Sequence, residues 1–288
     1  MKRFFAVVLV LAALSSPAIA QNGSDMAIER DAVVAAAMDY MEGALTADED
    51  RMARGVHPEL TKVLIRPMRQ TGRHVLSYNT ATTLIEWVRA ADTTRLAQMD
   101  KNVDVTVFDI GNGMATARAI GQIWYDFLQL GKINGEWRIV NVLWSPNRLQ
   151  AENQEGVQEE PGDRAAIEET ALNYIDGAFS GDGDRMAAAL HPEMTKMLLA
   201  ERRETGVQYL HKMGPSDLIE GTHAGLGVLP EDERKIEIEI HDVSHGMAAV
   251  KVTSALYIDH LQVGKFNGEW KIINVLWVPN PDRPRRGG

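Results

Sequence analysis

The sequence contains no cysteine, which excludes disulfides, thiolate catalysis and lipid attachment through a thiol. It also lacks a Gly-x-Ser-x-Gly nucleophile elbow, a Gly-rich phosphate loop ending in Lys, and a His-Glu-x-x-His zinc motif. His241 and His245 lie four residues apart, but they span a predicted strand end and turn, which does not favour a shared metal. We therefore expect no metal site and no cofactor.

Positive charge is scarce. Only 30 Lys and Arg stand against 40 Asp and Glu, so the formal net charge is −10. An acidic chain repels the phosphate backbone of nucleic acids, and no nucleic-acid partner is expected. The acidity itself is typical of a soluble protein. The 288 residues suffice for two domains of ordinary size.

Long apolar runs are absent except at the N-terminus. There, Lys2 and Arg3 precede an apolar run from Phe4 to Leu14, and the small residues Ala18-Ile19-Ala20 follow. This order is typical of a secretory signal peptide, and the run is too short to span a bilayer. We expect cleavage after Ala20, which removes two positive charges and takes the net charge from −10 to −12. The remaining chain would be secreted or periplasmic, with no membrane contact.

What the sequence does contain is a long internal repeat. Residues 131–144 (GKINGEWRIVNVLW) return as residues 264–277 (GKFNGEWKIINVLW), with eleven of fourteen positions identical. Earlier segments align too, but residues 73–100 match residues 207–233 poorly. A repeat of this length indicates a duplicated domain rather than a solenoid. The expected divisions are a signal peptide at 1–20, a first domain at 21–148, a linker at 149–162, a second domain at 163–279, and a flexible tail at 280–288.

Each repeat begins with helical periodicity and ends with strand periodicity. In the opening helix, apolar residues and one tyrosine share a face: Val33, Ala37, Tyr40, Met41 and Ala44, and again Ile167, Ala171, Tyr174, Ile175 and Ala178. A short second helix is predicted from the N-caps Asp48 and Asp182 to Pro58 and Pro192, and a third near 80–91 and 215–222. Strands follow, with one long strand ending near Leu130 or Val263. Hairpin turns are expected at Asn134-Gly135 and Asn267-Gly268. Each repeat is therefore predicted to be an α+β domain with an antiparallel meander.

These motifs resemble the putative lumazine-binding family. The resemblance rests on Asp50-Arg51-Met52, His57-Pro58-Glu59 and the closing segment 131–144, each with its counterpart, and covers residues 28–146 and 164–279. The family belongs to the nuclear transport factor 2-like (SnoaL-like) superfamily, which includes ketosteroid isomerase, scytalone dehydratase and polyketide cyclases. The resemblance implies a cone, in which a curved antiparallel sheet wraps around helices and leaves a pocket at its open end. It also implies pterin-like ligands.

Members of that superfamily commonly pair sheet against sheet. A tandem duplication joined by a short linker could make this pair within one chain. We therefore expect the two domains to form an internal pseudo-dimer and the protein to be a monomer.

Two pairs of residues are candidates for acid–base chemistry or ligand binding. His57 and His191 precede a proline, and an ordinary histidine pKa suits proton transfer, but a histidine bonded to nearby backbone explains the pattern equally well. Tyr40 and Tyr174 lie on the apolar helix face. The resemblance implies that a hydroxyl there could bind a carbonyl, as in the isomerase branch of the superfamily. The alternative is a packed core tyrosine whose hydroxyl is bonded internally.

Further candidates lie on the strands. Asp126 shares residue parity with Arg118 and Trp124, which places the three on one face of the long strand; Asp259, Lys251 and Tyr257 repeat the pattern. This face could hold a polar planar ligand or be a solvated surface with a weak ion pair. Asn141 and Asn274 are expected on the apolar face of Ile139 and Ile272, bonded to protein or to ligand. Four tryptophans are interpreted as core or domain-interface residues: Trp137, Trp144, Trp270 and Trp277.

The sequence favours a protein that binds a small, apolar or planar molecule in one or both cones. The candidate ligand-binding residues are Tyr40, His57, Asp126, Asn141, Tyr174, His191, Asp259 and Asn274. The alternative is a cofactor-free lyase, isomerase or hydrolase, with His57 or His191 as the base and Tyr40 or Tyr174 steadying an oxyanion. A third reading is a protein-interaction module whose cones are filled by side chains. Fold analogy does not choose among them.

Overall fold

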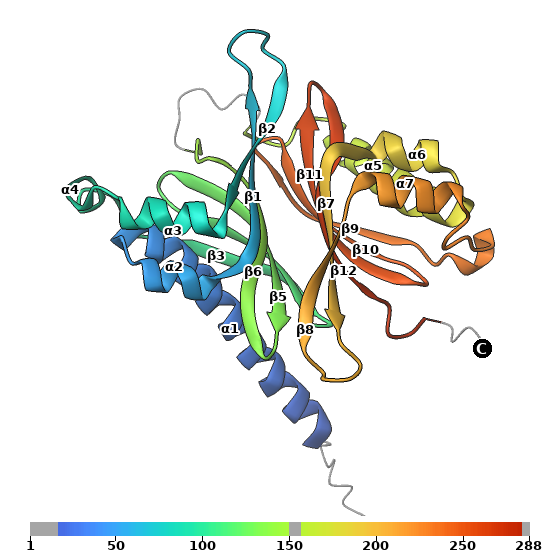
Figure 1. Cartoon of the computed structure of the whole chain (residues 1–288), viewed down its shortest axis with the longest axis horizontal. Coiled ribbons are helices and arrows are strands. Elements are labelled where there is room, and N and C mark those ends of the chain that lie inside the picture. The colour runs from blue at the N-terminus through green and yellow to red at the C-terminus, as the bar shows by residue number, and fades with distance from the viewer. Residues whose placement is uncertain (1–16, 150–156, 284–288) are drawn as a thin grey trace, which may run out of the picture.

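The computed structural model describes residues 17–149 and 157–283, and they form two domains of the same architecture (Figure 1). The first domain consists of α1 (Pro17–Thr46), α2 (Glu49–Gly55), β1 (Val56–Pro67), β2 (His74–Thr80), α3 (Ala81–Arg89), α4 (Thr93–Leu96), β3 (Asp104–Gly111), β4 (Met114–Ile120), β5 (Trp124–Ile133) and β6 (Glu136–Pro146). The second consists of α5 (Asp163–Ser180), α6 (Gly183–Ala189), β7 (Leu190–Glu201), β8 (Gln208–Met213), α7 (Pro215–His223), the 3-10 helix η1 (Glu231–Glu233), β9 (Glu237–Ser244), β10 (Met247–Thr253), β11 (Tyr257–Phe266) and β12 (Glu269–Pro279).

The α+β class is confirmed, and each sheet contains three strands more than the sequence indicated. The strand orders are β2-β1-β6-β5-β4-β3 and β8-β7-β12-β11-β10-β9. Strands β1 and β6 pair in parallel, as do β7 and β12, so the sheets are not purely antiparallel. Strand β1 was missed because Pro58 indicated a helix end. Pairing with β6 shifts register between Val56 and Thr61, and a proline is tolerated where a ladder is interrupted.

Several local predictions are confirmed. Asp48 and Asp182 cap α2 and α6, each accepting a hydrogen bond from a backbone N–H three residues on. The Asn-Gly turns have positive φ at both residues, 52° and 90° at Asn134 and Gly135. The single long strand is wrong: a turn at residues 121–123 divides it into the antiparallel strands β4 and β5. Its counterpart divides β10 from β11.

The two sheets pack against each other in the middle of the molecule, with the helices on the outer sides (Figure 1). Helices α1 and α5 cover the concave faces, where each domain has its own apolar core. The convex faces share two further clusters. One includes Phe127 with Phe266, and the other includes Val140 with Leu276. The expected internal pseudo-dimer is therefore present.

Equivalent residues of the two domains make reciprocal contacts across this interface. Arg118 pairs with Asp242 at 2.7 Å, and their counterparts Lys251 and Asp109 also pair at 2.7 Å. Gln129 and Gln262 each donate a side-chain hydrogen bond to a backbone carbonyl of the other domain, at 2.7 and 2.8 Å. Such exchange is the geometry of an isologous dimer.

Parts of three expected segments lie outside the described residues. These are residues 1–16 of the signal peptide, 150–156 of the linker and 284–288 of the tail. Residues 17–20 form the beginning of α1. Among the helices that the structure describes, none is long and apolar enough to cross a bilayer.

Candidate functional site

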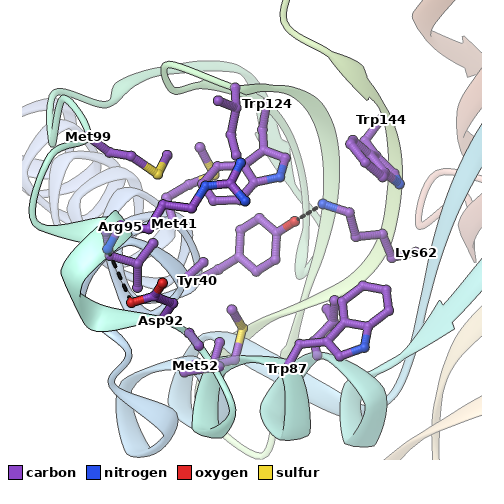
Figure 2. A pocket seen from close by; sticks show the side chains of 16 residues that line it. Tyr40, Met41, Met52, Lys62, Trp87, Asp92, Arg95, Met99, Trp124 and Trp144 are labelled. Atoms are coloured by element: carbon purple, nitrogen blue, oxygen red, sulfur yellow. Dashed lines mark hydrogen bonds between the residues drawn. The ribbon is translucent and has the colours of Figure 1, made fainter.

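A cavity of about 340 Å³ lies in the first domain between α1, α3, the α4 segment and strands β5 and β6 (Figure 2). Its walls are made mainly of large apolar side chains: Met41, Met52, Leu84, Trp87, Leu96, Met99, Trp124 and Trp144. Trp87 and Ile123, 56% and 41% exposed, lie where the cavity meets solvent. A concave, largely apolar site of this size suits a small organic molecule.

Three polar residues meet at the inner end of this cavity. The Tyr40 hydroxyl donates to Asp126 Oδ2 at 2.6 Å, and Lys62 Nζ lies 3.0 Å from the same oxygen. Lys62 also donates to the Tyr40 hydroxyl, as Figure 2 shows. All three are at most 4% exposed. Tyr40 and Lys62 line the cavity, and Asp126 lies behind them.

Each member of this triad comes from a different element. Tyr40 lies on the buried face of α1, in the same cluster as Val33. Asp126 lies on β5, two residues before Leu128 of the same cluster, so both face the helices. Lys62 on β1 faces inward like Leu60, whereas Val63 faces the other domain. The alternation of β1 therefore directs a cation into an apolar core.

Burial changes the titration of two of these groups. Burial, followed by the Asp126 carboxylate, raises the pKa of Tyr40 well above its ordinary value, so the hydroxyl stays protonated. Burial lowers the pKa of Lys62, because the charged form loses its hydration, although Asp126 opposes the shift. The Lys62 nitrogen lies 4.5 Å from the centre of the Trp144 ring, a cation–π contact. Asp126 Oδ1 and Trp144 Nε1 are buried and have no hydrogen-bond partner among the residues that the structure describes.

The second domain repeats the triad but not the walls. Tyr174 donates to Asp259 at 2.8 Å, Lys196 lies 2.9 Å from the same oxygen, and Lys196 packs over Trp277. The cavity is smaller, about 200 Å³. Four wall positions differ: Met41, Trp87, Val88 and Trp124 correspond to Ile175, Gly221, Thr222 and Tyr257. The two cavities therefore share one chemistry and differ in size and polarity.

The candidate histidines lie outside both cavities. His57 Nδ1 accepts a hydrogen bond from the Glu59 backbone N–H at 3.1 Å, and His191 does the same with Glu193. Burial lowers the pKa of both. Neither lines a cavity with Tyr40 or Tyr174. This is the local backbone role that the sequence left open, and it brings no base to the triad.

The prediction that Arg118 and Asp126 share a strand face is wrong. Ala119 pairs with Asp126 across the β4–β5 turn, which puts Arg118 opposite Phe127 on the convex face. There Arg118 binds Asp242 of the second domain, and Lys251 likewise binds Asp109. Asp126 and Asp259 instead face inward to a tyrosine and a lysine.

The expected placement of the two asparagines is also wrong. The β5–β6 register shifts between Gln129 and Leu130, so Val140 and Asn141 both face the second domain while Ile139 faces the helices. Asn141 donates to Gln129 at 2.8 Å, and Asn274 donates to Gln262 at 2.8 Å. These amides organise the domain interface and do not line either cavity.

Sequence reasoning missed Lys62, Lys196 and the cavity roles of Trp144 and Trp277. Lys62 is not among the sequence candidates, because β1 was not predicted as a strand. A signal was present: Lys62 sits between Leu60 and Leu64 in a period of two, where a lysine on an apolar face needs a partner. Trp144 and Trp277 were interpreted as core or interface residues, but they line the two cavities. Trp137 and Trp270 do belong to the domain cores.

Comparison with solved structures gives proteins that each match less than half of this chain. An NTF2-like protein of unknown function from Shewanella baltica OS155 is 19% identical, with 42% of this chain and 95% of that chain covered and a TM-score of 0.32. One from Methylobacillus flagellatus KT is 22% identical, with 43% and 97% covered and a TM-score of 0.33. A ketosteroid isomerase-like protein from Erwinia carotovora atroseptica SCRI1043 is 17% identical, with 42% and 98% covered and a TM-score of 0.28.

Comparison with curated proteins gives no match. The family model described as putative lumazine-binding matches residues 28–145 and, a second time, residues 162–278. These ranges are the two structural domains and make up most of the chain. The protein therefore belongs to the putative lumazine-binding family, with two tandem nuclear transport factor 2-like domains in one chain.

Proposed function

We propose that this protein binds a planar, largely apolar small molecule in the cavity of the first domain, with an acceptor oxygen of the molecule held by Lys62. The observation that carries the proposal is an aromatic-walled cavity of about 340 Å³ that ends at a buried cation. Trp87 and Trp124 offer faces for stacking. We also propose, from the N-terminal signal pattern, that this binding takes place outside the cytoplasm.

The polar end of the cavity favours an acceptor on the ligand. A lysine ammonium has three N–H donors, and two of them point to Tyr40 and Asp126. No third acceptor for Lys62 is present among residues 17–149 and 157–283. A carbonyl oxygen entering the cavity would take this donor. Lumazine, the molecule in the family's description, is a planar bicyclic dione with that chemistry.

The alternatives are less well supported. An interaction module with filled cones does not fit two cavities of about 340 and 200 Å³. An enzyme with His57 or His191 as its base does not fit histidines that bond to nearby backbone outside the cavities.

Titration of the purified chain with lumazine tests the proposal, with tryptophan fluorescence and native mass spectrometry as readouts. We expect saturable binding of one molecule per chain. Trp124→Ala should weaken binding about tenfold, because a stacking face is lost. Trp87→Ala should act in the same direction without affecting folding, since Trp87 is exposed at the rim. Tyr257→Ala, at the position of Trp124 in the second domain, should leave the affinity unchanged.

Either of two results would overturn the proposal. One is the absence of binding by lumazine and by a second planar acceptor, 2-naphthoate. The other is binding that responds to Tyr257→Ala and ignores both tryptophan substitutions.

A further inference from the structure

We propose that Lys62 forms a Schiff base with aldehydes that enter the first cavity, with Asp126 as the proton acceptor and Tyr40 as the proton donor. The inference rests on the proposed binding cavity and adds a covalent step to it. The reactive class is a planar aromatic aldehyde. The geometry behind it is a primary amine at the inner end of an open apolar cavity, in direct contact with a carboxylate and a phenol.

The surroundings of Lys62 make its ammonium easier to deprotonate, and such a reaction needs that deprotonation. Only 4% of the residue is exposed, and burial lowers the pKa of its amine. Asp126 Oδ2 lies 3.0 Å from Nζ, close enough to accept a proton directly. The triad is poorly explained as a stabilising element alone, because a buried ion pair contributes little net stability.

The step balances without an oxidant or a reductant. Lys62 gives one proton to Asp126, and the nitrogen lone pair attacks the carbonyl carbon while the carbonyl electron pair moves to oxygen. A second nitrogen proton moves to that oxygen, which gives a carbinolamine. The carbinolamine hydroxyl takes a proton from Tyr40 and leaves as water, and the nitrogen lone pair closes the C=N bond. Asp126 returns its proton to Tyr40 across their 2.6 Å hydrogen bond.

The net charge at the inner end of the cavity is the same before and after the Schiff base forms. Lys62 begins as an ammonium and ends as a protonated imine, and Asp126 is a carboxylate in both states. The buried ion pair is therefore kept in the product.

The second domain provides an internal comparison. Lys196 has the same two polar partners, at the end of a cavity of about 200 Å³ in which Gly221 and Tyr257 take the places of Trp87 and Trp124. A bicyclic aldehyde should therefore react mainly at Lys62. A small aldehyde should react at both lysines.

The experiment treats the purified full chain with 2-naphthaldehyde and sodium cyanoborohydride, which reduces the imine to a stable amine. Peptide mapping by mass spectrometry then compares labelling rates at Lys62, Lys196 and the exposed Lys235. We expect Lys62 to react at least about tenfold faster than Lys235, because its partners transfer protons. Propanal in place of 2-naphthaldehyde should label Lys62 and Lys196 at similar rates.

Variants separate chemistry from burial. Tyr40→Phe and Asp126→Asn should slow labelling at Lys62 and leave Lys196 and Lys235 unchanged, with circular dichroism as the folding control. Tyr174→Phe is the matched variant and should slow propanal labelling at Lys196 only.

The proposal is overturned if Lys62 reacts no faster than Lys235, or if Tyr40→Phe and Asp126→Asn leave its rate unchanged. Lumazine binding measured on the same sample keeps this failure distinct from failure of the proposed function. Binding without labelling removes only the Schiff base, and labelling without binding removes only the planar-ligand proposal.

Discussion

Lys62 is a single residue that connects stability and chemistry in the first domain. Its ammonium is removed from water and is compensated by Asp126, by Tyr40 and by the face of Trp144. Desolvation of two charges offsets most of their attraction, so the pair adds little to stability as a pair. Removal of one partner is different, because it leaves a buried charge uncompensated.

Lys62→Met should therefore destabilise the protein by about 3 kcal/mol, measured by urea unfolding, because Asp126 loses its cation. The triple variant Lys62→Met, Tyr40→Phe, Asp126→Leu should recover most of this loss, because no buried polar group of the triad remains unpaired. Lys196→Met should show a similar loss in the second domain. A triple variant as unstable as the single one would contradict this account of the triad.

At the scale of elements, the position of Tyr40 depends on how closely α2 approaches α1. Gly55, at the end of α2, touches the α1 backbone: a Cβ there would lie 2.7 Å from Tyr40 N and 2.8 Å from Ala36 O. These are backbone atoms, which cannot rotate away. The equivalent residue of the second domain is Ala189, so the contact is closer in the first domain.

Gly55→Ala should push α2 away from α1 and cost about 1–3 kcal/mol, the range for overpacking a buried contact. The shift acts on the backbone of Tyr40, so lumazine affinity should fall as well. Ala189→Gly is the matched variant, and it should leave binding unchanged. Unfolding curves and lumazine titrations measure both effects. Wild-type stability and affinity in Gly55→Ala would show that the helices can separate freely.

The helices, strands and turns also show how much of the fold and of the site could be predicted from the sequence. The repeat, the opening helices, the caps at Asp48 and Asp182 and the Asn-Gly hairpins were predicted because each is a local pattern. The faces of the strands were not predicted, because a turn or a bulge changes which residues share a face. The turn at residues 121–123 places Arg118 on the face opposite Asp126, and the bulge at Val140 places Asn141 on the face opposite Ile139. Tyr40 and Asp126 were named as separate candidates, and only their tertiary contact with Lys62 makes them one site.

In the molecule as a whole, the two sheets cover each other's convex faces. The Arg118–Asp242 and Lys251–Asp109 pairs and the two glutamine bonds occupy both convex faces within one chain. We therefore predict a monomer. Sedimentation equilibrium should give the mass of one chain, which is 31.9 kDa for the full sequence. A mass twice that of the chain would show that a further surface pairs.

The interface is reciprocal in position but not in residue type. Three histidines of the second domain lie there, His241, His245 and His260, and their first-domain counterparts are Phe108, Asn112 and Phe127. His241 stacks on Phe108 with ring centres 5.6 Å apart. His260 lies between Thr116 Oγ1, 2.8 Å away, and Asp109, 3.0 Å away.

His245 is held as a neutral ring. Its Nε2 accepts a hydrogen bond from the Arg148 backbone N–H at 3.3 Å, so a proton on Nε2 would face a donor. Its Nδ1 lies 2.8 Å from Ser244 Oγ, and its ring packs against Tyr125 at 4.4 Å. Burial, with a further contribution from the Arg148 charge and against the opposing Asp242, lowers the pKa of His245 to about 4.

The last prediction is that acid weakens the folded state through His245. Between pH 6.5 and about 4 the unfolded chain binds a proton at this residue and the folded chain does not, so the free energy of unfolding falls as the pH falls. The loss is complete near pH 4 and amounts to at most about 3 kcal/mol. His245→Asn should remove this part of the pH dependence. The left-handed backbone there, φ 55°, is the conformation that Asn112 adopts at the equivalent position, φ 53°. Urea unfolding at several pH values measures the slope, and His211→Asn, at an exposed histidine, should leave it unchanged. Equal slopes in wild type and His245→Asn would mean that the acid sensitivity of the interface comes from another group.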